Sequence, residues 1–171
     1  VRKNVVVRDA LAKTGSLALF EVVLQDARIE TTKVVWDAKT LQEAARNGFL
    51  EVIKRMLELD PKIDPTEDDN KAIRLAAQHG HLDIVDLLMS HKKIDPKTFV
   101  WDLESLDVAI YFGHTEAVHR MLKQFDPKAD INKIKNPWYR HVNISRWLLN
   151  HERFDPTRPI YGLRKRRIVQ K

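Results

Sequence analysis

The sequence contains no cysteine, only five glycines and no long apolar run. The absence of cysteine excludes disulfide bonds, zinc–thiolate sites and thiol nucleophiles. No apolar stretch approaches the roughly 18 residues that a membrane-spanning helix needs, and the first residues lack the apolar core of a secretory signal. From these absences we expect an intracellular protein, cytoplasmic or nuclear, that does not insert into a membrane.

The sparse glycines also exclude several classes of enzyme. Loops that cradle phosphates need clustered glycines, and the chain contains no G-x-x-x-x-G-K-[ST], no dinucleotide fingerprint and no G-x-S-x-G elbow. The histidines lack the His-x-x-x-His spacing of a helical metal site, since His114 and His119 are five residues apart. We therefore expect no catalytic residue, no metal site and no cofactor.

Four of the glycines recur at a fixed period. Gly15, Gly48, Gly80 and Gly113 are 33, 32 and 33 residues apart, and such a period is typical of repeat arrays. Mostly apolar residues follow each glycine at steps of two, four, five, eight and nine, which together make one stripe on an α-helix. Small or apolar residues also stand three and four positions before it, and an apolar residue stands seven positions before the last three of these four glycines, at Leu41, Ile73 and Leu106. Each period therefore predicts a short helix, a tight turn with glycine in the left-handed conformation, and a second helix.

Three further features repeat with the glycines. A short polar residue stands eleven positions earlier and predicts a helix N-cap; these residues are Asn4, Asp37, Asp69 and Asp102. An Asp-Pro pair follows the second helix and predicts a turn rather than a general acid; its aspartates are Asp64, Asp95, Asp126 and Asp155. A histidine directly follows the turn position at His81, His114 and His141. We expect these histidines to hydrogen-bond the loops of neighbouring repeats.

The last Asp-Pro pair implies a fifth unit in which Arg140 takes the position of the turn glycine. In that unit the apolar stripe continues through Val142, Ile144, Leu148 and Leu149.

With this pattern the sequence resembles the ankyrin repeat family. The closest stretch runs from residue 72 to residue 89, Ala-Ile-Arg-Leu-Ala-Ala-Gln-His-Gly-His-Leu-Asp-Ile-Val-Asp-Leu-Leu-Met, and the resemblance covers roughly residues 4–156. The usual Thr-Pro-Leu-His turn is absent, and this Asp-Pro-rich variant is similar to the divergent arrays of amoebae and giant viruses. The resemblance implies an all-α solenoid of about five stacked helix–turn–helix repeats.

The period also predicts the organisation of the chain. We expect the repeat array to span residues 1–157, with units at about 4–33, 34–65, 66–98, 99–128 and 129–157. The first helix of the fifth unit should be shortened or replaced, because Pro137 falls within it. Residues 158–171 form a separate, basic C-terminal tail.

The resemblance further implies that the chain binds another protein through its concave side, formed by loop tips and the exposed ends of the first helices. The predicted partner-binding residues are Trp36, Arg46, Arg74, Gln78, His79, Trp101, Tyr111 and Phe112. Exposed aromatic side chains near arginine are typical of interface hot spots. For Trp36 and Trp101, which share a Trp-Asp pair, packing on flanking repeats in place of the missing turn residues is an equal alternative.

The charge of the chain is concentrated in the tail. Residues 158–171 hold six basic residues and no acid, which accounts for the whole net charge of +6. A neutral array argues against a nucleic-acid-binding stripe along the repeats. The run Arg164, Lys165, Arg166 and Arg167 leaves open a nuclear-import signal, a contact with nucleic acid, a ribonucleoprotein or an acidic surface, or a solvated extension. A purely structural segment of a longer chain is a third possibility.

Overall fold

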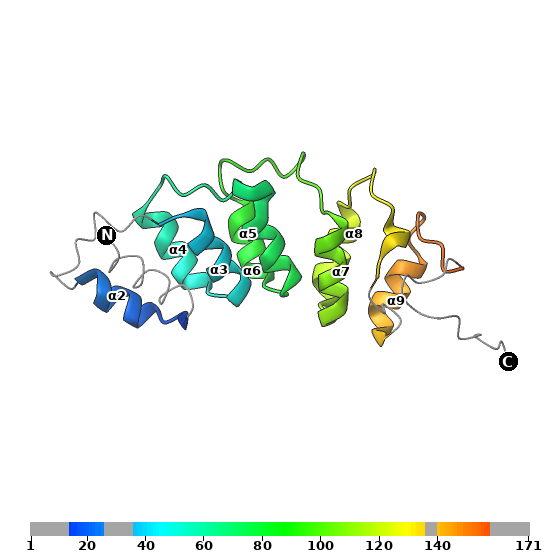
Figure 1. Cartoon of the computed structure of the whole chain (residues 1–171), viewed down its shortest axis with the longest axis horizontal. Coiled ribbons are helices and arrows are strands. Elements are labelled where there is room, and N and C mark those ends of the chain that lie inside the picture. Colours follow the sequence, from blue (N-terminus) through cyan, green and yellow to red (C-terminus); the bar gives the residue numbers. More distant parts are fainter. Residues whose placement is uncertain (1–13, 26–35, 136–139, 158–171) are drawn as a thin grey trace. The chain divides into compact units, whose positions relative to one another are not determined.

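The computed structural model describes residues 14–25, 36–135 and 140–157, without the side chains of Val23 and Leu24. The predicted cap Asn4 and the tail 158–171 lie outside these residues. The α-helices of the described part are α2 (Leu17–Gln25), α3 (Ala38–Asn47), α4 (Leu50–Leu59), α5 (Glu67–Gln78), α6 (Leu82–Met89), α7 (Leu103–Phe112), α8 (Thr115–Lys123) and α9 (Val142–Leu149) (Figure 1). The chain divides into two compact units, Val1–Thr98 and Phe99–Lys171, and each is described by itself.

In the first unit the helices pair as the period predicts. Gly48 and Phe49 alone separate α3 from α4, so the two helices run in opposite directions, and α5 and α6 pair in the same way. The first helices of successive repeats, α3 and α5, pack side by side, while α2 packs on α4 (Figure 1).

In the second unit α7 pairs with α8, and α8 packs against α9. Where the first helix of the fifth repeat was expected, the described residues hold only a 3-10 helix, η2 (Ile131–Lys133). Asn132 fixes this segment, since its side chain donates to the carbonyl of Arg153 at 3.0 Å and accepts from the N–H of Asp155 at 2.6 Å. Ile131 and Ile134 are buried beside it.

The apolar stripe forms the core. The residues seven positions before the turn glycine are fully buried, and so are those eight positions after it where the side chain is described. These residues are Leu41, Ile73, Leu106, Met56, Leu88 and Met121. Ile144 and Leu148, on the stripe of the predicted fifth repeat, are fully buried as well.

The stripe prediction was wrong at four described positions. Leu17, Leu19, Val142 and Leu149 are 36%, 43%, 73% and 49% exposed. In α2 the adjacent Phe20 takes the inward place and stacks on Trp36, with ring centroids 5.1 Å apart, and one residue is a rotation of about 100° around a helix. Val142 and Leu149 are the first and last residues of α9.

Three of the described turn glycines, Gly15, Gly48 and Gly113, are each covered by the side chain that follows the next turn. Gly48 has φ 80°, and the imidazole of His81 lies 2.5–3.0 Å from where a Cβ atom of residue 48 would stand. The same ring lies 3.2 Å from the carbonyl oxygen of Arg46 through Nε2, which confirms the predicted contact of His81 with a neighbouring loop. His141 covers Gly113 in the same way in the second unit.

Two of the described N-cap predictions are confirmed and one is wrong. Asp37 accepts from the N–H of Thr40 at 2.9 Å, and Asp102 accepts from that of Ser105 at 2.6 Å. Asp69 instead lies in a left-handed stretch, residues 68–70, with φ values of 53°, 58° and 59°. Its carbonyl oxygen accepts from Nε of Arg74 at 2.8 Å. Asp and Asn tolerate this conformation better than other non-glycine residues do.

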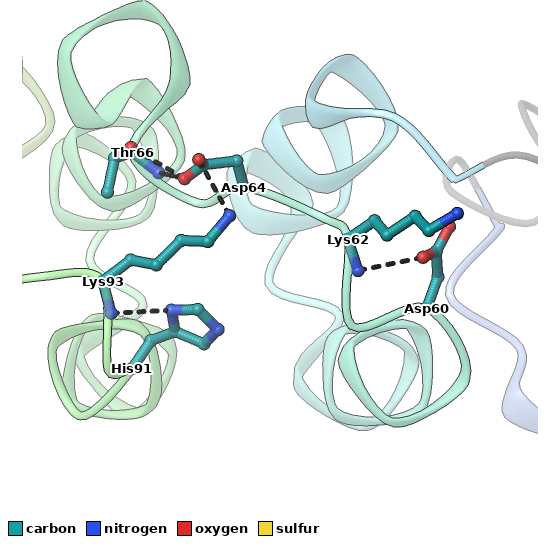
Figure 2. Close-up of polar contacts among 6 residues, drawn as sticks. All are labelled: Asp60, Lys62, Asp64, Thr66, His91 and Lys93. Carbon is teal, nitrogen blue, oxygen red and sulfur yellow. Dashed lines mark hydrogen bonds and ion pairs between the residues drawn. The ribbon is translucent and has the colours of Figure 1, made fainter.

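The Asp-Pro pairs form turns, as predicted. In all four, Oδ1 of the aspartate accepts from the N–H two residues later, at 2.8–2.9 Å. Asp64 has a second role, because its Oδ2 accepts from Nζ of Lys93 at 2.9 Å and so links two repeats (Figure 2). The hydrogen bonds from Lys93 and then Thr66 lower the pKa of Asp64 from 3.8 to about 2.

Replacing Gly48 with alanine should destabilise the protein by about 2 kcal/mol. A side chain at positive φ costs about 1–2 kcal/mol, and the new Cβ atom also displaces the ring of His81. Urea unfolding followed by circular dichroism measures the loss. In a His81→Ala background the further cost of Gly48→Ala should fall toward the conformational penalty alone. Equal losses in both backgrounds would contradict the packing role of His81.

The Asp64–Lys93 pair should make stability depend on acid pH. The pKa of Asp64 is lowered by folding, so its contribution is complete above pH 3.8 and is lost as the pH falls through 3.8 to about 2. Asp64→Asn, which keeps a turn-forming oxygen, should reduce stability at pH 7 by about 1 kcal/mol, allowing for solvent screening. It should also flatten the decline between pH 4 and pH 2. Thermal unfolding across this range measures both effects, with Asp95→Asn as the control for the turn; identical profiles for the two variants would contradict the pair's role.

Candidate functional site

Two adjacent aromatic side chains stand exposed at the end of α7. Tyr111 is 61% exposed and Phe112 52% exposed. Their rings meet edge to face, with centroids 5.1 Å apart and planes at 82°, and Phe112 also stacks on His114 at 5.9 Å. The two rings are therefore held in one arrangement by each other and by the helix end that carries them.

These aromatics border a groove within the second unit. Its volume is about 410 Å³, and it is lined by Ile110, Tyr111, Phe112, Arg140 and His141. Ile110 is fully buried and forms an apolar wall, while the ring of His141 is fixed by its packing on Gly113. A groove of this size accommodates one or two large side chains of a ligand.

Arg140 is a member of this site that was not predicted as a binding residue. It occupies the turn position that is glycine in the four earlier units, and its side chain is exposed. In the part of the chain that the structure describes, Arg140 makes no ion pair. The sequence signal was present, because a long cationic side chain at a position otherwise restricted to glycine places a charge where the other repeats have none.

Trp36 and Trp101 are not exposed as expected. They are 5% and 3% exposed. Trp36 stacks on Phe20, and Trp101 makes an edge-to-face contact with Phe99 at 4.8 Å. The backbone of Trp101 also pairs with residues 124 and 126 through two hydrogen bonds of 3.0 Å. Both tryptophans therefore have the packing role that was the alternative.

The remaining predicted binding residues belong to the first unit, whereas Tyr111 and Phe112 belong to the second. Arg46, at the end of α3, has a side chain that is 47% exposed and lies 3.9 Å from Glu43. Arg74 is only 11% exposed and holds Asp69, whereas His79 contacts the carbonyl of Leu75 at 3.0 Å. Gln78 is half-buried beside it. The tail residues Arg164, Lys165, Arg166 and Arg167 lie outside the described residues.

The described residues contain no group of three or more His, Cys, Asp or Glu side chains placed to hold a metal ion. His91 and His151 instead contact the backbone of the loops that follow them. Burial, followed by the charges of Lys93 and Lys92, lowers the pKa of His91 below its ordinary value. Nδ1 of His91 accepts from the N–H of Lys93 at 3.4 Å, and His151 repeats this contact with Arg153 at 3.3 Å.

Among the described helices, none is long and apolar enough to cross a membrane.

The different burial of the aromatics predicts different effects on stability. Trp36→Ala should lose about 3–5 kcal/mol of unfolding free energy, because it empties a buried, stacked position. Tyr111→Ala should lose less than about 1 kcal/mol, because most of the ring is already in water. Urea unfolding measures both. Comparable losses in the two variants would show that Tyr111 is part of the core rather than of a surface.

Comparison with known families agrees with the geometry of the repeats. A family model for ankyrin repeats, built as three copies, matches residues 9–100 and again residues 41–135. No curated protein and no solved structure matches the chain. The two matches to the family model together cover well over half of the sequence, and the helix–turn–helix units with left-handed glycine turns lie within them. The chain therefore belongs to the ankyrin repeat family.

Proposed function

We propose that the chain is a non-catalytic recognition module that binds another protein through Tyr111 and Phe112. Ankyrin repeats generally mediate protein–protein interaction and are typically not catalytic. The observation that supports this surface is the pairing of two exposed aromatic rings beside a groove. The internal compartment expected from the sequence is part of the same proposal.

A single exposed apolar residue would not support such a proposal, because much of any protein surface is apolar. Leu59 and Leu149 are exposed to a similar degree, but neither is among the five residues that line the groove. Tyr111 and Phe112 differ because they are adjacent, are oriented by each other and border a concave feature. Tyrosine is also among the residues most enriched at interface hot spots.

The energetics of binding favour this pair. Each ring can bury on the order of 100 Å² more against a partner, which at about 25 cal/mol per Å² gives roughly 2–3 kcal/mol for each. Aromatic side chains have only two rotatable angles, and the edge-to-face contact already restricts them. The ordering cost that usually opposes association is therefore reduced.

The remaining predicted residues have unequal places in this proposal. Arg46 keeps an exposed guanidinium and, with Gln78 and His79, is proposed as a secondary contact surface in the first unit. Arg74 supports the left-handed stretch at residues 68–70 through its contacts with Asp69. Trp36 and Trp101 contribute by holding the loops in place.

The proposal is tested by site-specific crosslinking in lysate of the source cell. A photoreactive phenylalanine analogue at position 112 should capture a discrete protein, whereas the same group at position 149, equally exposed in the same unit, should not. With that protein purified, Tyr111→Ala/Phe112→Ala should raise Kd at least 100-fold and Leu149→Ala less than twofold, with circular dichroism unchanged. Equal effects of the two changes would overturn the proposal.

A second candidate function is docking of a nucleic acid or ribonucleoprotein through the tail 158–171, favoured by its six basic residues. Binding through the tail should weaken steeply between 50 and 200 mM salt and disappear when the tail is removed. Recognition through Tyr111 and Phe112 should change little in either case. Filter binding with a 30-nucleotide RNA separates the two functions.

A further inference from the structure

We propose that the groove beside Tyr111 and Phe112 binds an acidic peptide segment, with an apolar side chain against the two rings and a carboxylate paired with Arg140. This inference rests on the proposed function and specifies the chemistry of the partner. Its basis is that one groove brings together an exposed aromatic pair and a guanidinium.

Arg140 provides the charge that selects the ligand. Its side chain is exposed, and among the described residues it has no carboxylate partner. None of the five residues that line the groove is acidic, so an incoming carboxylate meets no repulsion from the walls. A planar guanidinium matches a carboxylate through two parallel hydrogen bonds, which gives the contact orientation as well as attraction.

Two further groups can donate to the same ligand. The phenol of Tyr111 borders the groove and makes no hydrogen bond within the described residues, and the imidazole of His141 is held there by its packing on Gly113. The nearest acid on α7 by sequence, Asp107, has its Oδ1 engaged by the N–H of Lys135 at 3.0 Å. The groove thus combines apolar surface with hydrogen-bond donors.

The same charge argues against other occupants. The tail 158–171 carries six basic residues and no acid, so it does not complement Arg140. Nucleic acid requires several concentrated positive charges, whereas this groove offers one guanidinium. An acidic segment of another protein is the occupant that fits both the rings and the arginine.

The test is selection from a random dodecapeptide library displayed on phage, with the full chain as the target. We expect the recovered peptides to carry Asp or Glu within about three residues of an aromatic or long aliphatic residue. One such peptide, synthesised with a fluorescent label, should bind with a Kd that Arg140→Glu raises roughly 10- to 100-fold. Arg146→Glu, the same charge change at an exposed position of α9, should change this Kd less than twofold.

A charge exchange makes the test specific to the pair. The peptide with its acid changed to lysine should lose binding to the natural chain and regain it with Arg140→Glu, and circular dichroism should show that this exposed substitution leaves the fold intact. The proposal is overturned if no peptide depends on Arg140, if the acid is not enriched, or if the exchange restores nothing.

The outcome also separates this inference from the proposed function. If Tyr111→Ala/Phe112→Ala abolishes peptide binding while Arg140→Glu does not, the aromatic surface stands and the acidic ligand is rejected. If neither Tyr111→Ala/Phe112→Ala nor Arg140→Glu weakens peptide binding, both the aromatic surface and the acidic ligand are rejected. Sedimentation of the peptide-free chain adds one more result, since self-association that requires Phe112 would show a second copy as the occupant and overturn the acidic peptide.

Discussion

The contact between a left-handed glycine and the ring that covers it fixes the spacing of the repeats. At Gly48 the backbone has φ 80°, and the ring of His81 lies where any Cβ atom would be. This arrangement needs glycine twice, once for the dihedral angle and once for the close approach. It sets the distance between successive turns, so the side chains of α3 and α5 meet at matching positions. The buried alanines three and four residues before Gly48 and Gly80 depend on the same spacing.

That spacing also determines which positions remain outside. The two residues before each glycine end a helix whose inward face is already filled by the positions three, four and seven residues earlier. In the second repeat these two residues are Arg46 and Asn47, and in the fourth they are Tyr111 and Phe112. The same two positions are exposed in the second and fourth repeats and half-buried in the third, so their chemistry can vary without loss of the core. In the fourth repeat the variation produces aromatic surface.

Much of this was predictable from the sequence because periodic features report local geometry. The turn glycines, the caps Asp37 and Asp102 and the Asp-Pro turns each depend on a few neighbouring residues. Asp69 was mispredicted because the left-handed stretch at 68–70 is held by Arg74 and Gln42, contacts that the period does not encode. The sequence pattern also left the burial of Trp36 open, because Trp36 is covered by Phe20. A stripe of helical period does not specify whether Leu19 or Phe20 faces inward.

The groove depends on a position where the sequence departs from the repeat pattern. Arg140 stands where the pattern has glycine, and the first helix of its repeat is reduced to η2 in the described residues. At Gly48 and Gly113 a histidine ring covers the turn and leaves no room for a side chain there. At residue 140 a guanidinium is present, and it borders the most exposed aromatics of the described chain. A repeat protein gains specificity by such local changes, because the regular positions are constrained by packing while an irregular one adds a charge without disturbing the core.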